Sequence, residues 1–371
     1  MSNANGIREI AYFDCRGGGQ VVVDGTTAYV GHTVGPEATT MIDVSDPANP
    51  GQIAQIECNH QGVHAHKVRV VNDLMLTNYE SKAYAGKPDS GFRGGLNITD
   101  VSDPSNPKHV HFWECDGSGV HRFTFDGRYA YISPEIEGYI GNIVMILDLK
   151  DPANPEEVGR WHMPGQWIAG GEEPSWEKDA HRCHHPIRHG NHLYTSYWHG
   201  GFVILNIDDM SKPKMVSGMD WSPPFVFPTH TCLPIPFDIH GEKWMVVADE
   251  DAAKLRPDAP GAMLWMVNVS DLEHPMPVST VQLDEGPAPI RSGCHQPAED
   301  VKGTEIPCAW FSKGLQVVDI SNPFDLKVTA SFQPPVPQGS KEVLSNDVCW
   351  DDRGLIYLVD RDRGLHILER I

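Results

Sequence analysis

The sequence predicts an all-β protein, a seven-bladed β-propeller, and three observations lead to that fold. A short segment recurs along the chain, each repeat contains four short apolar runs, and the first strand of the chain matches the strand that the last repeat lacks. The repeat spacing of about 50 to 60 residues is typical of propellers and other repeat arrays. The 35 glycines and 30 prolines suit many tight turns between short strands.

The recurring segment combines apolar residues, an Asp or Asn, and a turn that ends in proline. Its aligned polar residues are Asp43, Asp100, Asp148, Asn206, Asn268 and Asp319. Such a side chain caps a turn by accepting backbone hydrogen bonds, so we expect it to be structural. The segment reads as the third strand of a four-stranded unit, and four antiparallel strands make one propeller blade.

The predicted blades cover residues 14–57, 58–115, 116–163, 164–221, 222–281, 282–333 and 334–371. The last one stops after its third strand, whereas residues 7–17 match the fourth-strand pattern. We therefore expect the N-terminal strand to pair with the blade at 334–371 and to close the ring, which leaves no exposed central edge. Residues 1–371 then form a single domain whose blades pack on their neighbours.

The third-strand segment also carries a family resemblance. The sequence NITDVSDPSNP at 97–107, with counterparts such as MIDVSDPANP at 41–50, resembles the repeat of the LVIVD-repeat β-propeller proteins. The resemblance extends over nearly the whole chain and implies the propeller fold. It implies little about function, because that family is largely uncharacterised.

Composition narrows the range of partners. The formal net charge of −21 argues against nucleic acid and anionic membranes, since both attract basic surfaces. The N-terminus lacks the pattern of a secretory signal. Cys15, Cys58 and Cys115 recur at one repeat position, so we expect buried, reduced thiols and a cytoplasmic protein. A homo-oligomer is compatible with the sequence.

The histidines suggest a site at the propeller axis. Aligning the repeats brings six ligand-type residues to the start of the first strand, namely His66, His121, His184, His230, His295 and Asp347, with Gly19 in the first repeat. In a propeller this strand lines the central channel. Imidazoles gathered there need hydrogen-bond partners or a shared cation. We predict a metal site formed by these six residues; a water-filled polar channel is the alternative.

The donor set bears on the identity of the metal. Imidazole suits Fe(II), Cu or Zn, whereas carboxylates suit Mn or Ca. We expect a divalent transition metal, Fe(II) in the first place, with Cu or Mn as alternatives. Cys183, Cys232 and Cys294 neighbour predicted ligands, but strand alternation should turn their side chains away.

Further polar residues are expected at the same mouth of the channel. Loops that follow second strands carry the predicted acid–base groups Glu80, Glu135 and Asp360. Residues predicted to contact substrate or to orient ligands are His64, His185, His199, Glu250 and Trp198. Three longer segments, 81–93, 166–179 and 249–261, frame the mouth and are expected to help bind a small-molecule substrate.

These features predict a metalloenzyme, an oxidoreductase of the oxygenase type that acts on a small aromatic or apolar molecule. A histidine-ringed channel is similar in design to the iron-dependent carotenoid and stilbene cleavage oxygenases and to copper-dependent propeller oxidases. This likeness concerns architecture only. A metal-dependent lyase or hydrolase is the second hypothesis, because the carboxylates could transfer protons beside a Lewis-acidic ion. A non-catalytic interaction propeller is the third.

Overall fold

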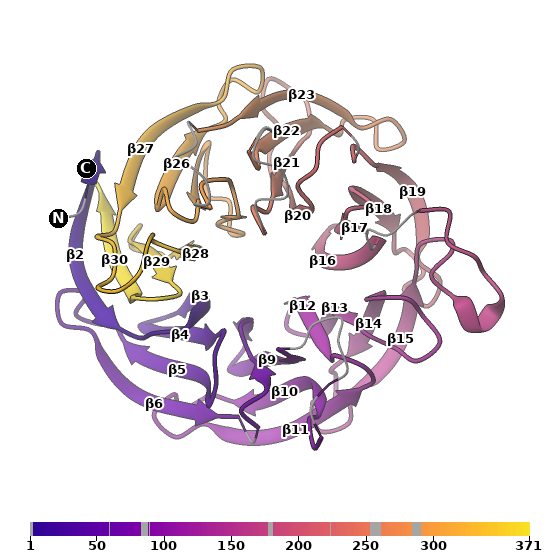
Figure 1. The fold of residues 1–371 in the computed structure, drawn as a ribbon, viewed down its shortest axis with the longest axis horizontal. Helices are drawn as coiled ribbons and strands as arrows, with labels where there is room; N and C mark the ends of the chain where they lie inside the picture. The colour runs from indigo at the N-terminus through magenta and orange to yellow at the C-terminus, as the bar shows by residue number, and fades with distance from the viewer. Residues whose placement is uncertain are drawn as a thin grey trace.

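The computed structural model describes residues 3–58, 60–82, 88, 90–176, 181–222, 224–252, 261–283 and 291–371. Within these ranges the chain forms β-strands and one short 3₁₀ helix, η1 (Ile168–Gly170), with no α-helix. Antiparallel sheets stand around a central axis in the manner of propeller blades (Figure 1). In this part of the chain no helix has the length and apolar character needed to cross a bilayer.

The N-terminal half forms three sheets whose strands follow chain order from the axis outward (Figure 1). The first contains β3 (Gly18–Asp24), β4 (Thr27–His32), β5 (Glu37–Asp43) and β6 (Gly51–Glu57). The second contains β7 (Val63–His64), β8 (Val68–Val71), β9 (Leu74–Ser81), β10 (Gly94–Asp100) and β11 (Lys108–Cys115). The third contains β12 (Val120–Phe125), β13 (Tyr129–Pro134), β14 (Val144–Asp148) and β15 (Glu156–Trp161).

The next eight strands form a single hydrogen-bonded sheet, because Trp198 pairs with Thr229 between β17 and β20. Its first four strands are β16 (His181–His189), β17 (His192–Trp198), β18 (Phe202–Asn206) and β19 (Lys214–Met219). Its other four are β20 (Thr229–Pro234), β21 (Trp244–Asp249), β22 (Leu264–Asn268) and β23 (Met276–Val281).

The two remaining sheets both include strands from the N-terminus. One contains β24 (Gln296–Pro297), β25 (Glu305–Ala309), β26 (Leu315–Asp319), β27 (Lys327–Gln333) and β1 (Asn3–Asn5). The other contains β28 (Ser345–Trp350), β29 (Ile356–Asp360), β30 (Gly364–Arg370) and β2 (Ile7–Asp14). The β2–β30 pairing runs from Ile7 opposite Arg370 to Asp14 opposite Gly364, so the two termini lie side by side (Figure 1).

The recurring Asp or Asn holds a turn in six of the seven predicted repeats. Its side-chain oxygen accepts the backbone N–H two residues later, for example from Ser45 to Asp43 at 2.8 Å and from Asp208 to Asn206 at 2.9 Å. The other four aligned positions make the same bond. The segment is therefore part of the scaffold, as its turn chemistry predicts.

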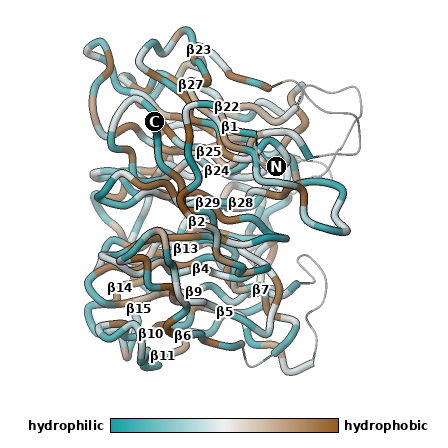
Figure 2. The backbone as a smooth tube through the Cα atoms, turned by 90° about the vertical axis from the view of Figure 1, so that its left-hand side faces the viewer, coloured by the Kyte–Doolittle hydropathy of each residue, from teal (hydrophilic) through white to brown (hydrophobic). Residues whose placement is uncertain are grey.

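The hydrophobic core lies between neighbouring sheets. Trp244 and Trp310 come from adjacent sheets, are nearly inaccessible, and belong to one cluster of buried side chains. A similar cluster joins Tyr357 of β29 to Val30 of β4. Hydrophobic residues lie mainly on the strands, and the turns are mainly hydrophilic (Figure 2). All eight cysteines are free. Cys15 and Cys58 are buried as expected, whereas Cys115, also expected to be buried, is only partly buried.

Candidate metal centre

A continuous arc of imidazole rings lines one cavity at the inner strands. Successive ring centroids are 3.9, 5.2, 4.5, 4.5 and 4.2 Å apart along the series His64, His66, His121, His184, His230 and His295. All six side chains are buried. The structure therefore brings together the five histidines predicted as ligands, and His64 joins them.

The cavity has a volume of about 290 Å³. Besides the histidines its lining includes Lys67, Arg182, Trp198, Glu250, Arg291 and Arg361. This volume is close to the lower end of the range found for small-molecule sites.

β-Bulges aim several of these histidines into the cavity. The inner strands shift register between Val120 and Phe123 at His121, and between Thr229 and Thr231 at His230. A bulge turns one side chain out of the regular alternation, so it directs the imidazole toward the axis while its neighbours stay in the sheet.

The last sheet presents Asn346 at this position, not Asp347. Its bulge falls between Ser345 and Asp347, and Asn346 lines the histidine cavity. Asp347 lines a different, smaller cavity with Arg69 and Glu299, where burial raises its pKa to about 6. Asp347 is thus one residue away from the position at which the sequence alignment put it.

Hydrogen bonds at Nδ1 fix the orientation of four rings. His64 Nδ1 lies 2.7 Å from the Thr33 carbonyl oxygen, His184 Nδ1 lies 2.8 Å from that of His230, and His295 Nδ1 contacts that of Asn346. His121 Nδ1 lies 2.8 Å from both oxygens of Glu80. A neutral imidazole has one N–H, so donation from Nδ1 leaves the lone pair on Nε2. Acceptors of this kind orient metal-binding histidines.

One short contact in the arc joins His121 Nε2 and His184 Nε2, 2.8 Å apart. With both Nδ1 atoms donating, two lone pairs face each other, which is unfavourable without a cation. Two nitrogens bound at about 2.0 Å and about 90° apart on one ion would have this separation. The alternative is a protonated Glu80 that donates to His121 Nδ1, so that His121 Nε2–H donates to His184. Burial raises the Glu80 pKa well above its usual value, which favours that form when no metal is bound.

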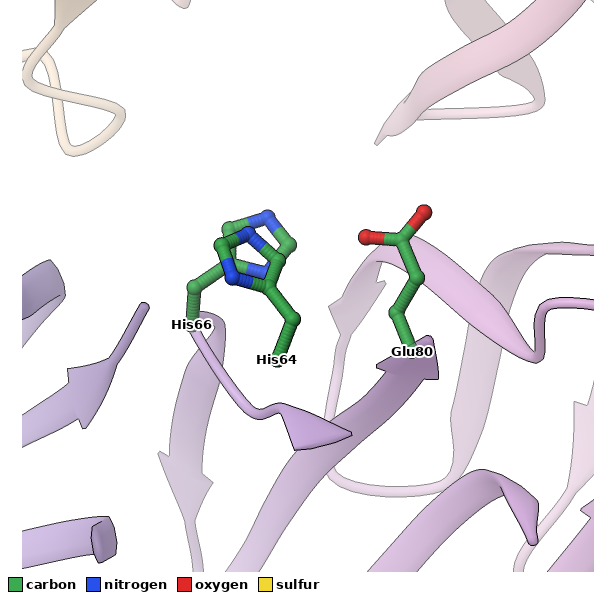
Figure 3. Close-up of side chains that lie close together, drawn as sticks. All are labelled: His64, His66 and Glu80. Atoms are coloured by element: carbon green, nitrogen blue, oxygen red, sulfur yellow. The ribbon is translucent and has the colours of Figure 1, made fainter. Parts of the chain in front are cut away.

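Two further groupings offer ligand atoms within 4.8 Å of one another, namely His64, His66 and Glu80, and His184, His230 and Glu250. In the first, the rings of His64 and His66 overlap at a tilt of 31°, and the Glu80 side chain lies beside them (Figure 3). In the second, Glu250 oxygens lie 3.8 Å from the Nε2 atoms of both His230 and His295. The carboxylates of Glu80 and Glu250 therefore each lie close to imidazoles of the arc, at different histidines.

His66 and His230 differ from the other rings. Arg122 Nη1 lies 2.9 Å from His230 Nε2, which makes that lone pair the acceptor of a guanidinium hydrogen bond. The Asn78 amide nitrogen lies 3.3 Å from His66 Nδ1. His66 and His230 are therefore weaker ligand candidates than His121 and His184, because a neighbouring donor already contacts one nitrogen of each ring. A cation at His230 would displace Arg122.

The imidazoles are held in the neutral form that binds metals. Burial is the largest cause of a lowered pKa in all six rings, and the positive charge of nearby Lys67 or Arg122 lowers the pKa of each ring further. For His64 the pKa falls to about 3. The arc is therefore uncharged at neutral pH.

Some of the remaining predicted residues line the histidine cavity and others do not. Trp198 stacks on His184 with centroids 4.9 Å apart, and Glu250 lines the cavity. Glu135 instead accepts the Ser118 backbone N–H at 2.7 Å, and Asp360 accepts that of Leu344 at 2.8 Å. Both carboxylates thus hold turns, outside the described lining of the cavity.

Two predicted histidines, His185 and His199, also lie outside the described lining of the histidine cavity. His185 Nε2 lies 3.7 Å from Glu299, which belongs to the smaller cavity. The His199 ring meets the edge of Trp198 at 6.0 Å. Parts of the three predicted framing segments, at 83–87, 89, 177–180 and 253–260, lie outside the described residues.

Sequence reasoning missed the basic residues of the site. Arg182, Arg291 and Arg361 line the histidine cavity. Below the arc, Glu299 accepts hydrogen bonds from Arg69, from Arg122 at 3.2 Å and from Gln296 at 3.2 Å. The signal was present, because Lys67, Arg122, His185 and Gln296 each directly follow an aligned histidine.

Comparison with known proteins identifies the repeat. The LVIVD repeat matches residues 91–111, 189–220 and 308–333. No match is found among curated proteins.

Solved structures share the fold at very low identity. A protein from Lactobacillus plantarum is 10% identical, with a TM-score of 0.61 over 92% of this chain and 87% of that one. Sqt1 from Saccharomyces cerevisiae is 8% identical, with a TM-score of 0.57 over 95% and 86% of the two chains. The computationally designed Ika8 protein is 6% identical, with a TM-score of 0.56 over 97% and 98%. At these identities the likeness concerns the fold alone. The chain therefore carries LVIVD repeats on a β-propeller scaffold, as its recurring segment predicted.

Proposed function

We propose that the protein binds a divalent transition metal ion in the histidine cavity, with His121 and His184 as its central ligands. The observation that carries this proposal is the 2.8 Å separation of their Nε2 atoms, with each Nδ1 at an oxygen acceptor. His64 and His295 present the same tautomer from either side. A set dominated by imidazole suits Fe(II) or Cu better than Mn.

The scaffold is proposed to be a ring of seven blades closed by the N-terminal strand. Counting each half of the eight-stranded sheet as one blade gives seven groups of four or more strands. The pairing of β2 with β30 and the core cluster between β29 and β4 support closure. Closure matters for the site, because a ring holds inner strands from distant parts of the sequence at fixed spacing.

The reaction proposed for this centre is oxidation of a small molecule, of the oxygenase type. A bound Fe or Cu ion would supply redox chemistry there, and a Lewis acid would supply lyase or hydrolase chemistry. The chain's own residues would orient the ligands through Glu80, exclude bulk water by burial, and offer Glu250 for proton transfer. Trp198, stacked on His184, would give a flat apolar wall for substrate.

Metal analysis tests the proposal. The full chain, purified without a metal-affinity column and loaded separately with Fe(II), Cu(II), Mn(II) or Zn(II), should retain about one equivalent of a preferred ion after gel filtration. Activity with Fe or Cu but not with Zn would support the oxygenase reaction, and activity with Zn would favour the lyase or hydrolase. Retention of no ion would overturn the proposal and favour a non-catalytic propeller.

A further inference from the structure

Two equivalent aromatic residues pack against the histidine arc. Trp198 and Phe311 each follow a residue whose N–H donates to a glycine carbonyl, Tyr197 to Gly201 at 2.7 Å and Trp310 to Gly314 at 2.8 Å. Both have left-handed backbones, with φ of 55° and 34°. Such strain in non-glycine residues persists where the surroundings impose it, often at functional sites.

Each aromatic ring packs against one histidine of the arc. Trp198 lies 4.9 Å from His184, and Phe311 lies 4.4 Å from His295, measured between centroids. His230 is the ring between those two histidines, at 4.5 and 4.2 Å. The two stacks therefore stand on either side of His230.

Arginine side chains pack against both aromatic rings, Trp198 and Phe311. The guanidinium carbon of Arg182 lies 4.5 Å from the Trp198 ring, and those of Arg291 and Arg361 lie 5.7 and 5.5 Å from Phe311. Arg361 also donates from Nε to Asn346 Oδ1 at 2.6 Å. A guanidinium packed against an aromatic ring is partly immobilised, which lowers the entropy lost when it binds an anion.

The charge of the cavity is opposite to that of the protein. Its described lining contains four basic side chains, Lys67, Arg182, Arg291 and Arg361, and one acidic side chain, Glu250. The whole chain has a formal net charge of −21. A cavity with excess positive charge attracts anions, and a bound dication would add to the attraction.

We infer that the substrate of this centre carries a carboxylate or phosphate group that Arg291 and Arg361 bind beside Phe311. The inference rests on the proposed function, in which this cavity is the substrate site. It modifies the substrate expected from the sequence, because Trp198, which lines the cavity, can contact an apolar body while the arginines bind its anionic end. Arginine binds both oxyanions through paired N–H groups.

Titration calorimetry of the full chain with benzoate and with inorganic phosphate tests the inference, with and without metal. We expect one of the two anions to bind, and Arg291→Gln and Arg361→Gln each to weaken it by about tenfold, the loss typical of one charged hydrogen bond. The control is Arg93→Gln, an exposed arginine paired with Glu114, which removes the same charge and should leave binding unchanged.

The outcomes separate the two claims. Benzoate binding alone identifies a carboxylate with an apolar body, and phosphate binding alone identifies a phosphate ligand. If neither anion binds, or if Arg291→Gln and Arg361→Gln bind as tightly as Arg93→Gln, the inference is overturned. Metal content is measured on the same samples and should not change in the arginine variants. Anion binding by an unsubstituted protein that retains no metal ion would instead overturn the proposed function and leave the inference about the anion standing.

Discussion

Substitution of Glu80 tests most sharply whether its carboxylate orients His121 for metal binding. Both of its oxygens lie 2.8 Å from His121 Nδ1, and its side chain is buried. In the metal-bound form the carboxylate accepts the Nδ1–H and makes Nε2 the donor to the ion. Glu80→Ala removes this acceptor, and Glu80→Gln keeps an oxygen but loses the charge.

Groups that orient a metal-binding histidine typically contribute 10- to 100-fold in affinity, or about 1.4 to 2.7 kcal/mol. We expect Glu80→Ala to weaken Zn(II) binding by this range, and Glu80→Gln by less, because its amide oxygen can still accept the hydrogen bond. Competition with a chromogenic chelator at fixed pH measures the affinity.

Glu135→Gln is the matched control, since Glu135 occupies the equivalent sequence position in the next sheet, directly after β13, but accepts the Ser118 N–H. It should leave the affinity for Zn(II) unchanged. The reasoning is refuted if Glu80→Ala binds Zn(II) as tightly as the unsubstituted protein, or if Glu135→Gln weakens binding equally.

Three other predictions concern the arc, acid stability and the ring. His184→Ala should lower metal affinity by more than about 100-fold, the upper range for orienting groups. The control is His109→Ala on the outer strand β11, where the ring contacts Asn97, and it should leave metal affinity unchanged. Equal metal content in the two variants by elemental analysis would contradict this prediction. Burial lowers the pKa of His32, so its contribution to the free energy of unfolding is present above about pH 6.5 and is lost as pH falls below it. Urea unfolding at several pH values gives the slope of the free energy of unfolding against pH. Below about pH 6.5 this slope should be smaller in His32→Gln by at most about 1.4 kcal/mol per pH unit. An unchanged slope would show that His32 does not contribute. Removing residues 1–17 leaves β30 without β2, so it should lower the unfolding temperature and cause aggregation. Removing residues 1–5 takes away only β1 and should have a smaller effect. Equal effects of the two deletions would argue against closure of the ring by β2.

The scaffold was predictable because its signals repeat. Asp43 and its five counterparts make the same turn bond, so each copy reinforces the alignment of the others. The same alignment predicted that His66, His121, His184, His230 and His295 would meet. Strand order and turn chemistry were enough for that conclusion, since both depend on local sequence.

The finer geometry was not predictable for a physical reason. At a bulge the regular alternation fails, so the sequence does not reveal which of two adjacent residues faces the axis. Asn346 rather than Asp347, and Arg361 rather than Asp360, line the histidine cavity. The bulge between Ser345 and Asp347 lies at this place. The alignment marks Arg122 as the residue after an aligned histidine, but its contact with His230 joins different sheets and cannot be inferred from local sequence.

Metal content is the measurement that tests the central claim most directly. Protein purified without a metal-affinity step, then loaded and desalted, should carry about one equivalent of a transition metal, and the double variant His121→Ala/His184→Ala should carry almost none. A content below roughly a tenth of an equivalent in the unsubstituted protein, or an equal content in the double variant, would contradict the claim that His121 and His184 form a metal centre.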